Sequence, residues 1–214
     1  MTARRPRLRG VLHQYAFIAS LGCGAALIAS ASAGKGRAAA AVYAAAVAAL
    51  FGTSALYHRI TWRPAVRRWM RRLDHTMIYV MIAGTYTPIA LIALHGTLSR
   101  VVLIAAWASA GAGALFTLGI TRTPKRISAL IYVILGCAGV TLLGRLPGTI
   151  GWLAVSGLLL GGVLYSTGAV IYAKERPNPA PAVFGYHEIF HALVIAAAAL
   201  QYSVIAFGVL PHGR

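Results

Sequence analysis

The sequence predicts an all-α integral membrane protein, a bundle of seven transmembrane helices. Of its 214 residues 59% are hydrophobic and only 11% are charged, which excludes an ordinary soluble domain. Apolar runs of about 20 residues, the length that an α-helix needs to cross a bilayer, recur along the whole chain. Because the connections between these runs are short, we expect residues 1–214 to form a single domain.

Basic residues separate each apolar segment from the next. In chain order, the predicted helices are 12–33, 38–58, 74–94, 100–120, 127–144, 149–173 and 187–209. The connections between them contain, in the same order, Lys35 and Arg37, the arginine-rich stretch 59–72, Arg100, the stretch 122–126, Arg145, and the stretch 174–176. Each predicted segment is thus an apolar helix bounded by basic residues.

The net charge of +17 is distributed unevenly across this predicted topology. Fifteen of the 20 basic residues fall on the side of the N-terminus: Arg4, Arg5, Arg7, Arg9, Arg59, Arg63, Arg67, Arg68, Arg71, Arg72, Arg122, Lys125, Arg126, Lys174 and Arg176. The opposite side has Lys35, Arg37, Arg100, Arg145 and Arg214. The positive-inside rule therefore predicts a cytoplasmic N-terminus and an external C-terminus in a plasma membrane. We expect the basic loops to contact anionic lipid and not nucleic acid.

The N-terminal segment has a second interpretation. A basic stretch, the apolar run 15–28 and the small residues 31–33 together mimic a cleavable signal peptide. Cleavage would remove the first helix. The topology of the later helices is the same in either case.

Four ionisable side chains stand at the same end of separate predicted helices. The second helix ends at His58, the third begins at Asp74, and the seventh begins with His187 and His191. An ionisable group inside lipid costs several kcal/mol unless it pairs or binds something. Since the topology brings these helix ends to one level of the inner leaflet, the sequence predicts a metal site there.

The spacing within the helices agrees with this prediction. His187 and His191 are four residues apart, a common arrangement by which one helix face grips zinc, and His58 supplies a third nitrogen. Three protein ligands leave one tetrahedral position for water, as in catalytic zinc sites. Asp74 is placed to hold and deprotonate that water, and Ser54, one turn from His58, to supply a hydrogen bond.

Each of these residues also has a structural interpretation. Asp74 follows Arg71, Arg72 and Leu73, so it could be a helix N-cap or simply neutralise the neighbouring arginines. His187 and His191 could pack in the bundle without a metal. His58 has the chemistry of an interfacial histidine, and the Ser54 hydroxyl could bond to a carbonyl of its own helix. The other histidines, at positions 13, 75, 95 and 212, are not expected to ligate the metal.

Residues 187–191 also fit the H-E-x-x-H pattern of metalloproteases, in which the glutamate is the general base. A protease would need a third ligand downstream, where only His212 is available, on the outer side. We therefore expect Glu188 to favour the helix dipole or to pair with arginines of the inner face.

Five sequence blocks resemble one known family. They are Ser54-Ala-Leu-Tyr-His58, Leu73-Asp-His-Thr-Met-Ile-Tyr79, Ile82-Ala-Gly-Thr-Tyr-Thr-Pro88, Gly161-Gly-Val-Leu-Tyr-Ser-Thr-Gly168 and His187-Glu-Ile-Phe-His191. In this order and spacing they are similar to the hemolysin III family, the bacterial branch of the progestin and adiponectin receptor group.

The resemblance implies seven helices, an internal N-terminus, and zinc held by three histidines that map onto His58, His187 and His191. The aspartate that contacts the zinc-bound water maps onto Asp74, and the family serine onto Ser54. The related alkaline ceramidases hydrolyse lipid amides at a similar site. One departure is Gln201, where many relatives have a histidine.

Three functional hypotheses follow. The first is a zinc-dependent hydrolase of lipid amides or esters, in which zinc polarises the carbonyl and Asp74 is the general base. The second is a non-enzymatic sensor or membrane-homeostasis protein in which zinc is a structural clip. The third is a pore-forming hemolysin, for which the chain has few polar residues to line a channel. Membrane lipids, as substrate or ligand, are the expected partners.

Overall fold

The computed structural model describes residues 6–119 and 124–213. Four residues of the basic count, Arg4, Arg5, Arg122 and Arg214, lie outside these ranges. In chain order the helices are α1 (Val11–Ser30), α2 (Lys35–Arg59), α3 (Pro64–Pro88) continued by η1 (Ile89–Ala93), α4 (Gly96–Gly119), α5 (Lys125–Cys137) continued by η2 (Ala138–Leu142), α6 (Pro147–Lys174), and α7 (Tyr186–Val204) continued by η3 (Ile205–Val209) and η4 (Leu210–Gly213). Seven helices within the described ranges have the length and apolar composition needed to cross a membrane, which confirms the predicted all-α fold class.

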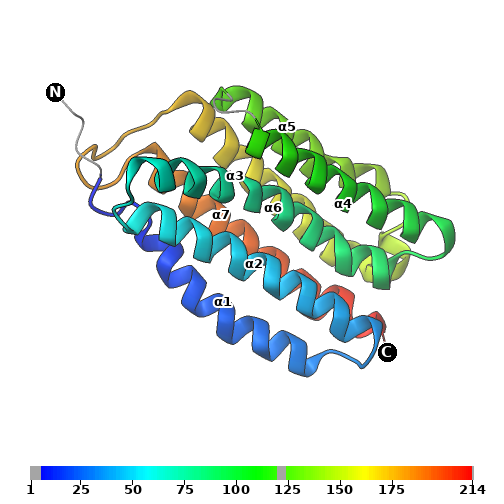
Figure 1. The fold of residues 1–214 in the computed structure, drawn as a ribbon. Coiled ribbons are helices and arrows are strands. Elements are labelled where there is room, and N and C mark those ends of the chain that lie inside the picture. The colour runs from blue at the N-terminus through cyan, green and yellow to red at the C-terminus, as the bar shows by residue number, and fades with distance from the viewer. Residues whose placement is uncertain (1–5, 120–123, 214) are drawn as a thin grey trace.

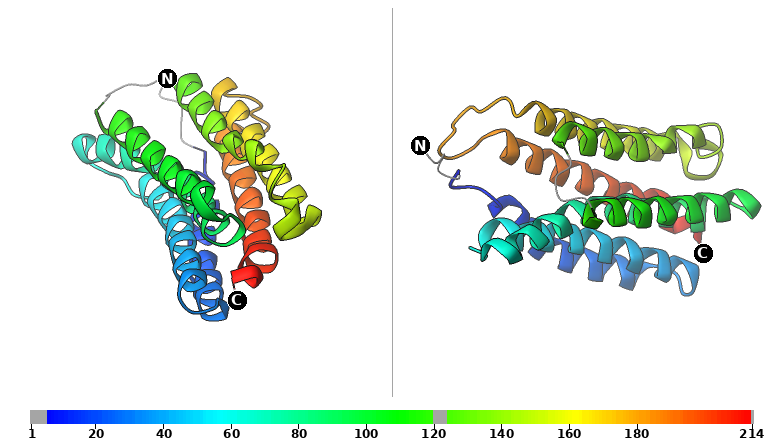
Figure 2. Two further views of the ribbon diagram at one scale, coloured as in Figure 1. Left: turned by 90° about the vertical axis from the view of Figure 1, so that its right-hand side faces the viewer. Right: turned by 45° about the horizontal axis from the view of Figure 1, so that its top comes forward.

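The helices are packed side by side with their long axes in roughly one direction, and α1 begins at the opposite end of the bundle from where α7 and its extension finish (Figure 1). The right-hand view of Figure 2 shows the same arrangement from another side. Contacts follow the chain order from α1 to α4 and from α5 to α7. Contacts between α1 and α7, and between α3 and α5, close these two groups into a ring.

The outer surface of the ring is apolar. Large hydrophobic side chains are exposed on most of the helices, among them Ile18, Leu21, Ile104, Leu115, Leu153 and Phe207. A soluble protein rarely exposes so much apolar surface, whereas a membrane-spanning bundle needs it to face lipid tails.

The third helix begins earlier than the sequence predicts. It starts at Pro64, a residue suited to the first helical position, and not at residue 74. Residues 64–73 are helical although they are rich in exposed arginine, because hydropathy marks only the part of a helix that lies in hydrocarbon. Asp74 is therefore well inside α3, and its interpretation as the N-cap is wrong: Arg63 occupies that position.

Glycines allow close helix contacts on both sides of the ring. A Cβ on Gly84 of α3 would lie 2.4 Å from Ala46 Cβ of α2, and one on Gly161 of α6 would lie 2.9 Å from Gln201 Cγ of α7. Such close approach requires glycine, as in other membrane helix pairs. A Cβ on the adjacent Gly162, by contrast, would meet nothing within 4 Å.

Candidate metal centre

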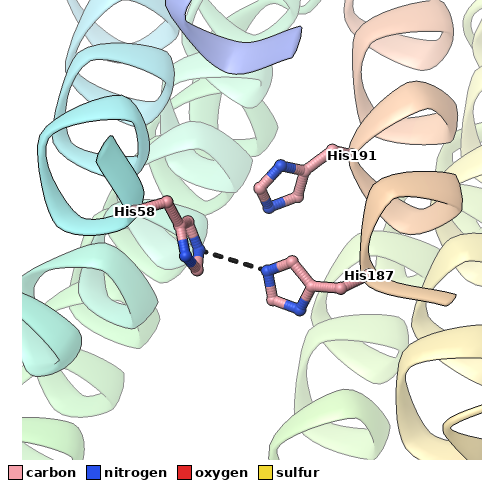
Figure 3. Close-up of side chains that lie close together, drawn as sticks. All are labelled: His58, His187 and His191. Carbon is pink, nitrogen blue, oxygen red and sulfur yellow. Dashed lines mark hydrogen bonds between the residues drawn. The ribbon is translucent and has the colours of Figure 1, made fainter. Parts of the chain in front are cut away.

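Three histidines from two distant segments converge at one end of the bundle. His58 lies in the last turn of α2, and His187 and His191 lie in the first two turns of α7. One ring nitrogen from each lies within 4.8 Å of the other two, and the Nε2 atoms of His58 and His187 are 3.1 Å apart. Figure 3 shows the three rings turned toward one another. The structure thus brings together the three residues predicted as metal ligands.

This donor set fits zinc. Two nitrogens bound to a tetrahedral zinc ion at about 2.0–2.1 Å are about 3.3 Å apart, close to the separation of the His58 and His187 nitrogens. The third histidine, His191, is 2% exposed, lies one turn from His187, and has a ring nitrogen within 4.8 Å of those of His58 and His187. Imidazole nitrogens without thiolates suit a borderline divalent metal such as zinc.

Ser54 and Asp74 lie beside this cluster. Ser54 is buried one turn before His58 on α2, and its hydroxyl neighbours the carboxylate of Asp74 from α3. Both residues line the same cavity as His187 and His191. The Asp74 carboxylate is not part of the three-nitrogen group itself.

His13 of α1 is a member of the site to which the sequence assigned no role. Its ring stacks on His191 with ring centroids 3.7 Å apart and an angle of 8° between the planes. Its Nδ1 atom is 2.8 Å from Ser54 Oγ, so the two share a hydrogen bond. A polar residue in the first turn of an apolar helix was the available signal. The missing fact was that α1 packs against α7.

Glu188 stabilises the start of α7 and is not part of the three-histidine group. It is fully buried, accepts a hydrogen bond from Arg9 Nε, and accepts another from the backbone N–H of Gly185 at 2.8 Å. The expectation that it pairs with an arginine is confirmed. Both carboxylate oxygens are engaged, and the third histidine comes from upstream in α2, so neither feature supports the metalloprotease alternative.

The segment that contains Arg9 lies against the α6–α7 connection. The backbone N–H groups of Arg7 and Leu8 donate to the carbonyls of Ala182 and Val183, at 3.0 and 3.2 Å. Gly10, at the start of α1, has a φ of 80°, and a Cβ there would lie 2.5 Å from His58 Cβ. The N-terminal segment therefore contacts both helices that carry the histidines: Arg9 binds Glu188 of α7, and Gly10 packs on His58 of α2. Only glycine fits at position 10.

A cavity of about 820 Å³ extends from the cluster into the bundle. At one end it is lined by the site residues His13, Ser54, Asp74, His187 and His191, and further along by apolar side chains that include Leu142, Leu146 and Val155. The last three belong to η2, the connection after it and α6, near the other end of the bundle. The cavity is therefore long and lined mostly by apolar side chains, with a group of polar residues at the histidine end.

The fold and the site together define a multi-pass membrane protein with a candidate metal centre. Seven helices suited to span a membrane surround an apolar cavity, and three histidines converge at one end of it.

The chain belongs to the haemolysin-III related family, whose pattern matches residues 1–202. It is 34% identical over 170 residues to Hemolysin-3 of Bacillus cereus, covering 79% of this chain and 74% of that protein. It is 30% identical over 158 residues to the Hemolysin-3 homolog of Bacillus subtilis (strain 168), covering 74% and 71%. It is also 24% identical over 168 residues to the monocyte to macrophage differentiation factor of Homo sapiens, covering 77% and 67%. The resemblance predicted from the motifs is confirmed.

Proposed function

We propose that this protein is a zinc-dependent hydrolase of lipid amides or esters that acts in membrane homeostasis. In this proposal it lies in the bacterial inner membrane with the histidine cluster on the cytoplasmic side, as the distribution of basic residues favours. The observation that carries the proposal is the placement of three histidines and a carboxylate at one end of a long apolar cavity.

Zinc held by His58, His187 and His191 would supply Lewis acidity, which polarises a carbonyl and lowers the pKa of water. Asp74 accepts a proton from the attacking water, and Ser54 orients its carboxylate. The water oxygen bonds to the acyl carbon as the bond to the amine or alkoxide breaks, and Asp74 returns its proton to that leaving group. The apolar cavity holds the acyl chain and excludes bulk water from the reacting carbonyl.

Zinc content is the first test. We expect about one zinc per chain in the detergent-purified wild type and none in the His187→Ala/His191→Ala variant. His95 and His212 are exposed, so the His95→Ala/His212→Ala variant is a matched control that should keep its zinc. Wild-type protein without zinc, after purification under conditions that retain bound metal, would contradict the proposal.

Hydrolysis is the second test. The zinc-loaded wild type should hydrolyse a ceramide or a long-chain fatty acyl ethanolamide, and Asp74→Asn should retain zinc but lose at least about 100-fold in turnover. If metal removal unfolds the bundle while Asp74→Asn works as well as the wild type, the structural-zinc hypothesis replaces this one. Zinc-independent dye release from liposomes would instead support the pore-forming hypothesis.

A further inference from the structure

Two buried polar atoms in the middle of the cavity have no use in the proposed reaction. The hydroxyl of Tyr165 on α6 and Oε1 of Gln201 on α7 have no hydrogen-bond partner among the described residues. Both side chains line the cavity, and Gln201 is only 8% exposed. The large majority of buried side-chain polar groups in native proteins have a hydrogen-bond partner, so two unpaired atoms that line one cavity point to a bound molecule as their partner.

The two atoms belong to one part of the cavity. Gly161 of α6 packs directly on the side chain of Gln201, and Tyr165 lies one turn further along α6, about 6 Å away along the helix axis. Nearby, the hydroxyl of Tyr43 on α2 donates to the carbonyl of Ala198 at 3.3 Å. A buried tyrosine at this depth can therefore find a partner within the protein, and Tyr165 does not.

The chemistry of the pair specifies a hydroxyl group. The phenol of Tyr165 can donate a hydrogen bond, while Oε1 of Gln201 can only accept one. A ligand hydroxyl placed between them could accept from the first and donate to the second, and so satisfy both. A methylene satisfies neither, and a ketone, which only accepts, leaves Oε1 of Gln201 unpaired.

The distance from the histidines places this hydroxyl along the chain of a ligand. Gln201 is ten residues after His191 on α7, about 15 Å along the helix. We infer that the cavity binds a lipid whose acyl chain carries a mid-chain hydroxyl, held by Tyr165 and Gln201. This inference rests on the proposed function, since it assumes that the reacting carbonyl lies at the histidine cluster.

Ricinoleoyl ethanolamide and oleoyl ethanolamide differ only in one mid-chain hydroxyl and are suitable probes. Binding of each to the full chain in detergent is measured by competition against tritiated oleoyl ethanolamide. The wild type should bind the ricinoleoyl compound about tenfold more tightly, as expected for a hydroxyl that completes two hydrogen bonds. Tyr165→Phe and Gln201→Leu should each reduce this ratio to about two or less.

Tyr202→Phe is the matched control for Tyr165→Phe. Tyr202 is the next residue after Gln201, and its hydroxyl donates to the carbonyl of Cys23 on α1 at 2.9 Å, so this variant should keep the tenfold ratio. A wild-type ratio near one, as expected if ordered water alone satisfies the pair, would overturn the inference. So would a tenfold ratio that persists in both variants.

The same preparations separate this inference from the proposed function. A tenfold preference without any amide hydrolysis would support the hydroxyl site and overturn the proposed reaction. Hydrolysis of both amides without a binding preference would support the reaction and overturn the hydroxyl site.

Discussion

The histidine end of the cavity and its middle are both polar, but they satisfy their polar groups differently. At the histidine end the protein supplies partners for most polar groups: Ser54 for His13, His58 for His187, and Arg9 for Glu188. Among the described residues, Nε2 of His13 and Oγ1 of Thr76, two residues after Asp74, are exceptions. In the middle of the cavity, the Tyr165 hydroxyl and Gln201 Oε1 have no hydrogen-bond partner among the described residues. The first region is preorganised by the fold, whereas the second is completed by what it binds.

The two regions also differ in how many elements hold them. Side chains of α1, α2, α3 and α7, together with the segment before α1, meet at the histidine end. The middle pair comes from α6 and α7 alone. Substitutions at the histidine end should therefore change stability and metal affinity, and substitutions in the middle should change ligand preference. The following predictions test this difference.

The largest effect on stability is expected for Arg9→Ala. This change removes the partner of a fully buried carboxylate, Glu188, and leaves its charge unpaired. We expect the free energy of unfolding to fall by about 3 kcal/mol, measured by denaturant titration in detergent. Arg7→Ala is the control, because the Arg7 side chain is exposed and its contact to Ala182 is made by the backbone.

Adding Glu188→Gln to Arg9→Ala should recover part of the loss, because it removes the buried charge. Equal stability of Arg9→Ala and Arg7→Ala would contradict the view that the segment before α1 stabilises the histidine end.

A smaller effect is expected for His13→Phe. Phenylalanine keeps an aromatic ring against His191 but cannot form the hydrogen bond to Ser54. Changes to residues that orient metal ligands commonly reduce metal affinity or activity about 10–100-fold, and we expect a loss in that range. Zinc affinity is measured by competition with a chelator, and turnover as kcat and KM separately.

His95→Phe, at an exposed position between α3 and α4, is the control for His13→Phe. A loss of folded protein without a change in zinc affinity per folded chain would show that His13 only fills space. Unchanged affinity and turnover would remove His13 from the site.

The sequence predicted the fold well because membrane spans depend on a one-dimensional property. Hydropathy and length locate seven segments without any knowledge of their packing. The same property missed the first turns of α3, which are helical but charged, and so led to the wrong N-cap interpretation of Asp74.

The candidate site was predicted in part for a related reason. His187 and His191 are neighbours on one helix, and the alternation of spans places His58 and Asp74 at the same end. Depth in the membrane follows from topology, but which helices touch depends on side-chain packing. The contact of α1 with α7 therefore brought His13 into the site without a clear signal in the sequence. That Tyr165 and Gln201 lie in the same part of the cavity likewise depends on the close contact at Gly161.

The smallest and most selective effect is expected from substitutions at two adjacent glycines of α6, Gly161 and Gly162, in the middle of the cavity. Gly161 packs on Gln201, whereas Gly162 lines the cavity, and a side chain there would meet no atom within 4 Å at its Cβ. Gly162→Leu should fill space otherwise open to the acyl chain and leave α6 and α7 in contact. Gly161→Leu should force them apart.

For Gly162→Leu we expect zinc content and stability close to those of the wild type. Turnover of the longest acyl chains should fall about fourfold, the equivalent of about 0.8 kcal/mol for one methylene excluded from the cavity. Turnover of shorter chains should remain. For Gly161→Leu, the free energy of unfolding should fall, and turnover should fall for substrates of every chain length. Equal loss for all chain lengths in Gly162→Leu would mean that the acyl chain does not occupy the middle of the cavity, and the distinction between the two regions would then hold for stability alone.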